Sequence, residues 1–158
     1  MIVYRISKQA YINDLNGIGA GMYGGRWNPK GINLCYTSGS IALAYLEFYI
    51  HNFHLLSTTH VCLAKISIGK PAPLLEYTED QLPENWDTKL SAIYGTQEIG
   101  KQFVLNSDGY ILKVPSAIVP GEYNYLLNPN HGNHKYTVVE QVVDPLSYDP
   151  RLIDIAKD

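Results

Sequence analysis

The chain has few charged residues, few cysteines and no long apolar run, and each shortage excludes a class of protein. Charged residues make up 17% of the 158 residues while apolar residues make up 46%; an average soluble domain carries about 25% charged residues. A chain so rich in apolar residues is not disordered. The net charge of −3 comes without a basic cluster, so we expect no direct binding to nucleic acid.

The two cysteines, Cys35 and Cys62, both lie in apolar, strand-like runs. This pattern predicts buried free thiols in a reducing compartment, although the spacing alone leaves a disulfide open. No apolar stretch approaches the roughly 20 residues of a transmembrane helix. The first residues, Met1–Ile6, enter a strand pattern and do not resemble a secretion signal. We therefore expect a cytoplasmic protein with no membrane partner.

The motifs of several common enzyme classes are also missing. The six glycines between residues 13 and 31 match neither a P-loop nor a dinucleotide-binding fingerprint. No Gly-x-Ser-x-Gly elbow of a serine hydrolase is present. The histidine pairs His51/His54 and His131/His134 lack the cysteine or glutamate companions of a zinc site. We therefore expect no bound metal.

The length of the chain fits one domain over residues 1–158. Alternating and β-branched residues predict strands over 2–6, 33–37, 60–68, 110–114, 123–127 and 136–143. Ser40 is expected to cap a largely buried helix over Ile41–Phe53, and Thr96 a second helix over Gln97–Asn106. Residues 13–31 are expected to form a long loop. Strands joined by short turns favour an α+β fold with a mainly antiparallel sheet and a buried central helix.

A cation, an aromatic ring and a carboxylate follow one another at short range in the sequence. Arg26 stands in the glycine-rich stretch Gly24–Gly31, Tyr36 in the next predicted strand, and Glu47 in the first apolar helix. Arg5, in the first strand, is a second candidate cation. An arginine fork grips phosphate or carboxylate, and a carboxylate on an apolar helix face needs donors or a cation to offset its burial. Taken alone, each residue also fits a structural role.

Together these residues resemble the RES domain family, which is named for an Arg, a Glu and a Ser. The matching stretches are Tyr4-Arg5, Gly24-Gly25-Arg26-Trp27-Asn28, Cys35-Tyr36-Thr37-Ser38, Ala44-x-x-Glu47, Val114-Pro115-Ser116 and Asn124-x-Leu-Leu-Asn-Pro-x-His131. The resemblance implies an ADP-ribosyltransferase-like fold with a split β-sheet core. It also implies an NAD-consuming toxin of a type II toxin–antitoxin system, whose partner antitoxin carries an Xre-like DNA-binding domain.

The same resemblance implies roles for individual residues. Arg5 and Arg26 would bind the phosphates and ribose of NAD+, and Tyr36 would stack on its nicotinamide. Glu47 would be the catalytic acid, with Arg26 and Tyr36 beside it in the catalytic group. The other members of the NAD+ site would be Ser116 and Asn124.

The acceptor in the reaction stays open at this point. Water would make the protein an NAD+ glycohydrolase, phosphate an NAD+ phosphorylase, and a protein side chain an ADP-ribosyltransferase. We expect NAD+ degradation with water or phosphate, and keep ADP-ribosyl transfer to a protein as the alternative. A catalytically inactive nucleotide- or partner-binding module is the alternative of another class. The intact Arg26, Tyr36 and Glu47 argue against inactivity.

Overall fold

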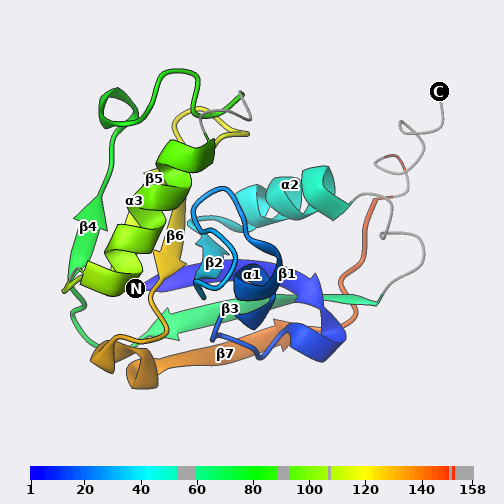
Figure 1. Cartoon of the computed structure of the whole chain (residues 1–158). Helices are drawn as coiled ribbons and strands as arrows, with labels where there is room; N and C mark the ends of the chain where they lie inside the picture. The colour runs from blue at the N-terminus through cyan, green and yellow to red at the C-terminus, as the bar shows by residue number, and fades with distance from the viewer. Residues whose placement is uncertain (53–59, 89–92, 107, 150, 152–158) are drawn as a thin grey trace.

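The computed structural model describes residues 1–52, 60–88, 93–106, 108–149 and 151, and its centre is a seven-stranded sheet (Figure 1). The strands are β1 (Ile2–Lys8), β2 (Cys35–Ser38), β3 (Val61–Ile68), β4 (Leu74–Glu76), β5 (Ile111–Pro115), β6 (Tyr123–Leu127) and β7 (Thr137–Val143). The α-helices are α1 (Ile18–Tyr23), α2 (Ile41–Asn52) and α3 (Ile93–Asn106), and the described 3-10 helices are η1 (Gln9–Tyr11), η3 (Glu79–Gln81) and η5 (Gly132–Tyr136).

The sheet consists of two halves that meet at one point. Its strand order is β4-β5-β6-β2-β1-β3-β7, and all neighbours are antiparallel except β4 and β5. Strand β1 pairs with β3 along its whole length, from Ile2 to Lys8, but with β2 only through Tyr4 and Ser38. In Figure 1 the β1-β3-β7 half runs in a different direction from β4, β5 and β6. The two central strands therefore separate beyond Tyr4.

Each half of the sheet is covered by its own helix. Helix α2 packs on the β1-β3 half through a core cluster of Ile6, Ala44, Phe48, Val61, Leu63 and Leu146. Helix α3 packs on the β5-β6 half through a cluster of Trp27, Leu34, Trp86, Phe103, Val104, Leu112, Val114 and Leu126. A third cluster, which includes Val3 and Cys62 of one half-sheet and Ile111 and Leu127 of the other, joins the two halves.

The predicted long loop over residues 13–31 contains a short helix, so that expectation was wrong. Helix α1 (Ile18–Tyr23) follows Gly17, whose φ of +64° lies in the left-handed region. A Cβ at Gly17 would lie 2.4 Å from the carbonyl oxygen of Leu34. Glycine is therefore required there both by conformation and by the close approach of the chain.

The expectation of a largely buried central helix was also wrong. Helix α2 ends at Asn52, and the predicted end, Phe53, lies outside the described residues. The helix buries Leu43, Ala44 and Phe48 and exposes Ile41, Leu46 and Ile50. It is apolar all round because its outer face carries exposed apolar side chains, which periodicity cannot distinguish from buried ones. The predicted cap is confirmed, since Ser40 Oγ accepts the N–H of Leu43 at 3.1 Å.

Helix α3 and strand β4 also differ from the expectation. Helix α3 begins at Ile93 rather than after Thr96, whose side chain instead donates to the carbonyl oxygen of Arg26 at 2.6 Å. Gly95 in the first turn hides this start, because glycine is a poor helix former. Strand β4 was not predicted. It has only three residues and pairs in parallel with β5, which lies far from it in the sequence.

The expectations of a mainly antiparallel sheet, of strand β6 and of buried thiols are confirmed. The mainly antiparallel sheet is present, and β6 has its predicted bounds. Cys35 and Cys62 are buried free thiols. No helix among the described residues is long and apolar enough to cross a bilayer.

We predict that Gly100→Ala destabilises the protein by about 1–3 kcal/mol, the usual cost of overpacking. A Cβ at Gly100 in α3 would lie 1.7 Å from the carbonyl oxygen of Trp27, so helix and loop must move apart. The matched control is Gly19→Ala in α1, where the added Cβ meets nothing within 4 Å and stability should hold or rise. Urea denaturation measures both. Equal stability of Gly100→Ala and the wild type would contradict the close packing.

Candidate active site

A cavity of about 820 Å³ opens where β1 and β2 separate, and its size is typical of small-molecule and cofactor sites. Its charged and aromatic lining residues are Tyr4, Arg5, Arg26, Trp27, Tyr36, Glu47, Phe48, His51 and Asp87. Asn124 lines it as well. All the site residues proposed from the sequence except Ser116 therefore border one cavity.

The loop that carries Arg26 is built around the fully buried side chain of Asn28. The amide nitrogen of Asn28 donates to the carbonyl oxygens of Ala20 and Ile32, both at 2.8 Å. Its Oδ1 accepts the hydroxyl of Tyr36 at 2.7 Å. A buried amide with its donors and acceptor satisfied fixes the path of the chain around it.

Side chains of helix α3 hold the same loop by donating hydrogen bonds to the backbone carbonyl groups of the loop. Gln97 Nε2 donates to the carbonyl oxygen of Gly25 at 2.8 Å, and Thr96 Oγ1 donates to that of Arg26 at 2.6 Å. Consecutive carbonyls of the loop are thus bound to consecutive residues of the helix. The position of the Arg26 side chain therefore depends on α3.

The hydroxyl of Tyr36 is used to hold this loop. It accepts the backbone N–H of Trp27 at 3.0 Å and donates to Asn28 Oδ1. Burial raises the pKa of Tyr36 above its ordinary value, so the hydroxyl stays neutral. The ring, which lines the cavity, is the part of Tyr36 that can contact a ligand.

The two arginines place positive charge in the cavity. Arg26 Nη1 donates to the carbonyl oxygen of Trp86 at 2.5 Å, and Arg5 Nη1 donates to that of Asp14. Neither guanidinium forms an ion pair with a carboxylate in the part of the chain that the structure describes. Each has five N–H donors, so both can still bind an anion such as phosphate.

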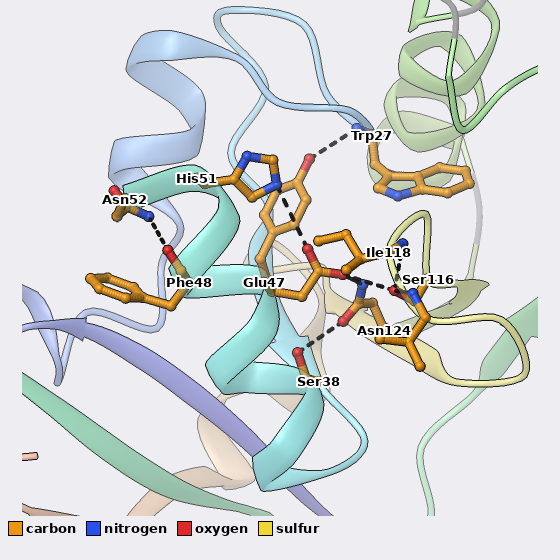
Figure 2. Close-up of polar contacts among 11 residues, drawn as sticks. Trp27, Ser38, Glu47, Phe48, His51, Asn52, Ser116, Ile118 and Asn124 are labelled. Atoms are coloured by element: carbon orange, nitrogen blue, oxygen red, sulfur yellow. Dashed lines mark hydrogen bonds and ion pairs between the residues drawn. The ribbon is translucent and has the colours of Figure 1, made fainter. Parts of the chain in front are cut away.

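Glu47 is held from one side and open on the other (Figure 2). Its Oε1 accepts the amide of Asn124 at 2.5 Å and the hydroxyl of Ser116 at 3.2 Å, while its Oε2 lies 3.7 Å from His51 Nε2. Burial raises the pKa of Glu47, but the contacts with His51, Asn124 and Ser116 outweigh burial and hold the pKa below its ordinary value. The result is an ionised carboxylate in a half-buried site.

Ser116 lies behind Glu47 and is not a cavity-lining residue. Its Oγ donates to Glu47 Oε1 and accepts the backbone N–H groups of Ile118 and Val119, each at 3.1 Å. Asn124 is held similarly, because its Oδ1 accepts the hydroxyl of Ser38 at 2.9 Å. Both side chains therefore orient the carboxylate.

The cavity also contains an imidazole and a second carboxylate that were not predicted as site residues from the sequence. His51 follows Glu47 by one helical turn, and this i,i+4 spacing is the signal that could have indicated it. Asp87 follows a buried tryptophan in an irregular stretch and carries no comparable signal.

Potential metal ligands gather away from this cavity. Among the described residues, His60, Cys62 and Asp144 bring their ligand atoms within 4.8 Å of one another, and none of the three lines the cavity. His60 and Asp144 form an ion pair. Of the histidine pairs in the sequence, His54 lies outside the described residues. In the other, Nδ1 of His131 and of His134 each has a hydrogen-bond partner.

The RES domain family model matches residues 2–150. The chain belongs to the RES domain family. Its relatives include Toxin Res of Yersinia enterocolitica, 36% identical over 96% of this chain and 99% of that protein. Toxin Res of Photorhabdus laumondii is 35% identical over 99% of this chain and 100% of the relative. The Prs ADP-ribosylating toxin of a Sphingobium strain is 35% identical over 89% of this chain and 88% of that protein.

A solved structure has the same fold. The crystal structure of the M. tuberculosis MbcT–MbcA toxin–antitoxin complex contains a chain that superposes with a TM-score of 0.72. The superposition covers 98% of this RES domain chain and 87% of that chain at 21% identity. The predicted ADP-ribosyltransferase-like fold with a split sheet is confirmed.

We predict that Glu47→Gln lowers stability at neutral pH and that this difference shrinks in acid. The pKa of Glu47 in the folded protein lies below its ordinary value of 4.5, so the ionised group stabilises the fold above that pH and loses its effect as pH falls below it. Urea denaturation of wild type and variant between pH 7 and about pH 3.5 measures the difference. The control is Glu84→Gln, which changes an exposed carboxylate outside the cavity. A difference that stays constant with pH would contradict the assignment.

Proposed function

We propose that this RES domain protein cleaves the bond between nicotinamide and ribose in NAD+, with water or phosphate as acceptor. The observation that carries the proposal is the content of one cavity: an ionised carboxylate and two arginines that pair with no carboxylate among the described residues. A ligand that suits both must carry negative charge at one end and develop positive charge at the other. NAD+ at its nicotinamide ribose meets both conditions.

To cleave the bond between nicotinamide and ribose, the protein needs mainly a well-placed negative charge and a fixed position of the substrate. Breaking the bond to nicotinamide builds positive charge on the ribose ring, as in glycoside hydrolysis. Glu47 Oε2 would stabilise that charge, and Asn124 and Ser116 hold the carboxylate ready through Oε1. Nicotinamide leaves as a neutral ring, so no strong general acid is needed.

The arginines would supply binding and orientation. Arg5 and Arg26 stand on separate elements, β1 and the loop before β2, so both can contact one extended anion. Pyrophosphate offers the oxygen atoms that guanidinium forks bind best. Fixing the pyrophosphate would place the ribose near Glu47. The ring of Tyr36, which borders the same cavity, would contact the nicotinamide.

The biological role we propose is that of a toxin in a toxin–antitoxin pair. Two relatives at 35–36% identity carry the name Toxin Res, and the solved structure of the same fold is a toxin–antitoxin complex. These names support a partner antitoxin, which we expect to be Xre-like. The excess of tyrosine, with 13 copies, suits a protein interface.

A second candidate function is transfer of ADP-ribose to a protein side chain. It is favoured by the Sphingobium relative, whose name is Prs ADP-ribosylating toxin. The first step, departure of nicotinamide, is the same in both reactions, and the two differ only in the acceptor. An inactive binding module remains as the alternative of another class.

We expect purified protein to release nicotinamide from NAD+, and Glu47→Gln to reduce this release about 100-fold or more because the variant lacks the negative charge. Mass spectrometry of the products, with and without phosphate, separates ADP-ribose from its phosphorylated form. Glu84→Gln is the matched control and should retain full turnover. No nicotinamide release by the wild type under any condition would overturn the proposal, and an ADP-ribosylated protein band would favour the second candidate.

We expect Arg26→Lys to raise KM for NAD+ about tenfold or more, because a lysine cannot reproduce the bidentate contact. Lys30→Ala, which removes an exposed cation of the same loop outside the cavity, should leave KM unchanged. Steady-state kinetics of nicotinamide release measures both. An unchanged KM in Arg26→Lys would show that this side chain does not bind the substrate.

A further inference from the structure

His51 lies beside Oε2 of Glu47, the carboxylate oxygen that Asn124 and Ser116 do not bind. It belongs to the last turn of α2, lines the cavity, and has a side chain that is 65% exposed. Because Asn124 and Ser116 both bind Oε1, the carboxylate presents Oε2 toward His51 (Figure 2). The two side chains come from adjacent turns of one helix, so their spacing is set by the backbone.

The separation of these two groups has a chemical meaning. The distance of 3.7 Å between Glu47 Oε2 and His51 Nε2 is too long for a direct hydrogen bond. A water molecule can contact both atoms at once, donating one hydrogen to the carboxylate and the other to the imidazole. Such a water would sit next to the group that we assign to the ribose, on the open side of the cavity.

We infer that His51 is the general base that activates water as the acceptor. As the bond from ribose C1′ to nicotinamide breaks, its electron pair returns to the nicotinamide ring. The water oxygen bonds to C1′, and the proton released from it passes to His51 Nε2 and then to solvent. The products are nicotinamide, ADP-ribose and one proton, so the step needs no further reactant. This inference rests on the proposed function, and of the two proposed acceptors, water and phosphate, it selects water.

The charges around His51 suit its role as general base and the role of Glu47 as the group that stabilises the ribose. The titratable and charged residues lining the cavity with it are Tyr4, Arg5, Arg26, Tyr36, Glu47 and Asp87. Glu47 is a weak base, because its contacts hold its pKa below the ordinary value. Histidine changes charge between pH 5 and 8, the range in which a general base works best. Because a general base acts only in its unprotonated form, we expect nicotinamide release to fall in acid.

The test uses His51→Gln and His51→Ala, with Leu46→Ala as control because Leu46 is exposed on the same helix and does not line the cavity. Nicotinamide release is measured against pH in phosphate-free buffer, and imidazole is then added to His51→Ala. We expect kcat to fall by about 100-fold, KM to change little, the acid limb of the pH profile to disappear, and imidazole to restore part of the activity. A side chain that only supported Glu47 would not respond to imidazole.

Four results would overturn the inference, and they are distinguishable. If kcat is unchanged in both His51 variants, His51 is not the general base, although the proposed cleavage of NAD+ is unaffected. If the His51 variants lower kcat but keep the acid limb of the pH profile, and imidazole restores no activity, His51 only supports Glu47 and is not the base. Wild-type turnover that requires phosphate rejects water as the acceptor. A wild type that releases no nicotinamide at all removes the proposed function itself, and this inference with it.

Discussion

The separation of β1 from β2 beyond the pair Tyr4–Ser38 is the constraint on which the rest of the structure depends. A continuous sheet would bury its centre under helices and leave no room for a ligand. Here the two halves carry separate helices, and the cavity lies between them. Side chains of β1 and β2, Arg5 and Tyr36 among them, border that cavity.

Such an opening needs a rigid border, because a charged loop beside a cavity would otherwise collapse into it. The buried amide of Asn28 and the donors of α3 provide this border by binding the backbone of the loop at several points. The side chain of Glu47 is likewise fixed by hydrogen bonds, from Asn124 and Ser116. The site is therefore prepared before any ligand arrives, as electrostatic catalysis requires.

Much of this could be predicted from the sequence, and the errors have physical causes. Strand β6 and the position of Glu47 at the cavity could be predicted because alternation and an isolated charge on an apolar helix are local signals. Helix α1 was missed because two glycines, Gly19 and Gly21, weaken its helical pattern and a side chain outside the helix, Asn28, holds it. The role of Asn28 was missed because Asn-Pro is an ordinary turn signal, and its burial depends on three segments coming together.

The most direct test of the account is a crystal structure of Glu47→Gln with NAD+ bound. We predict NAD+ in the cavity between β1 and β2, with ribose C1′ beside residue 47 and the pyrophosphate on Arg5 and Arg26. The ring of Tyr36 should contact the nicotinamide, and His51 should face the side of the ribose opposite the leaving group. NAD+ bound elsewhere, or bound here with its pyrophosphate away from both arginines, would contradict it.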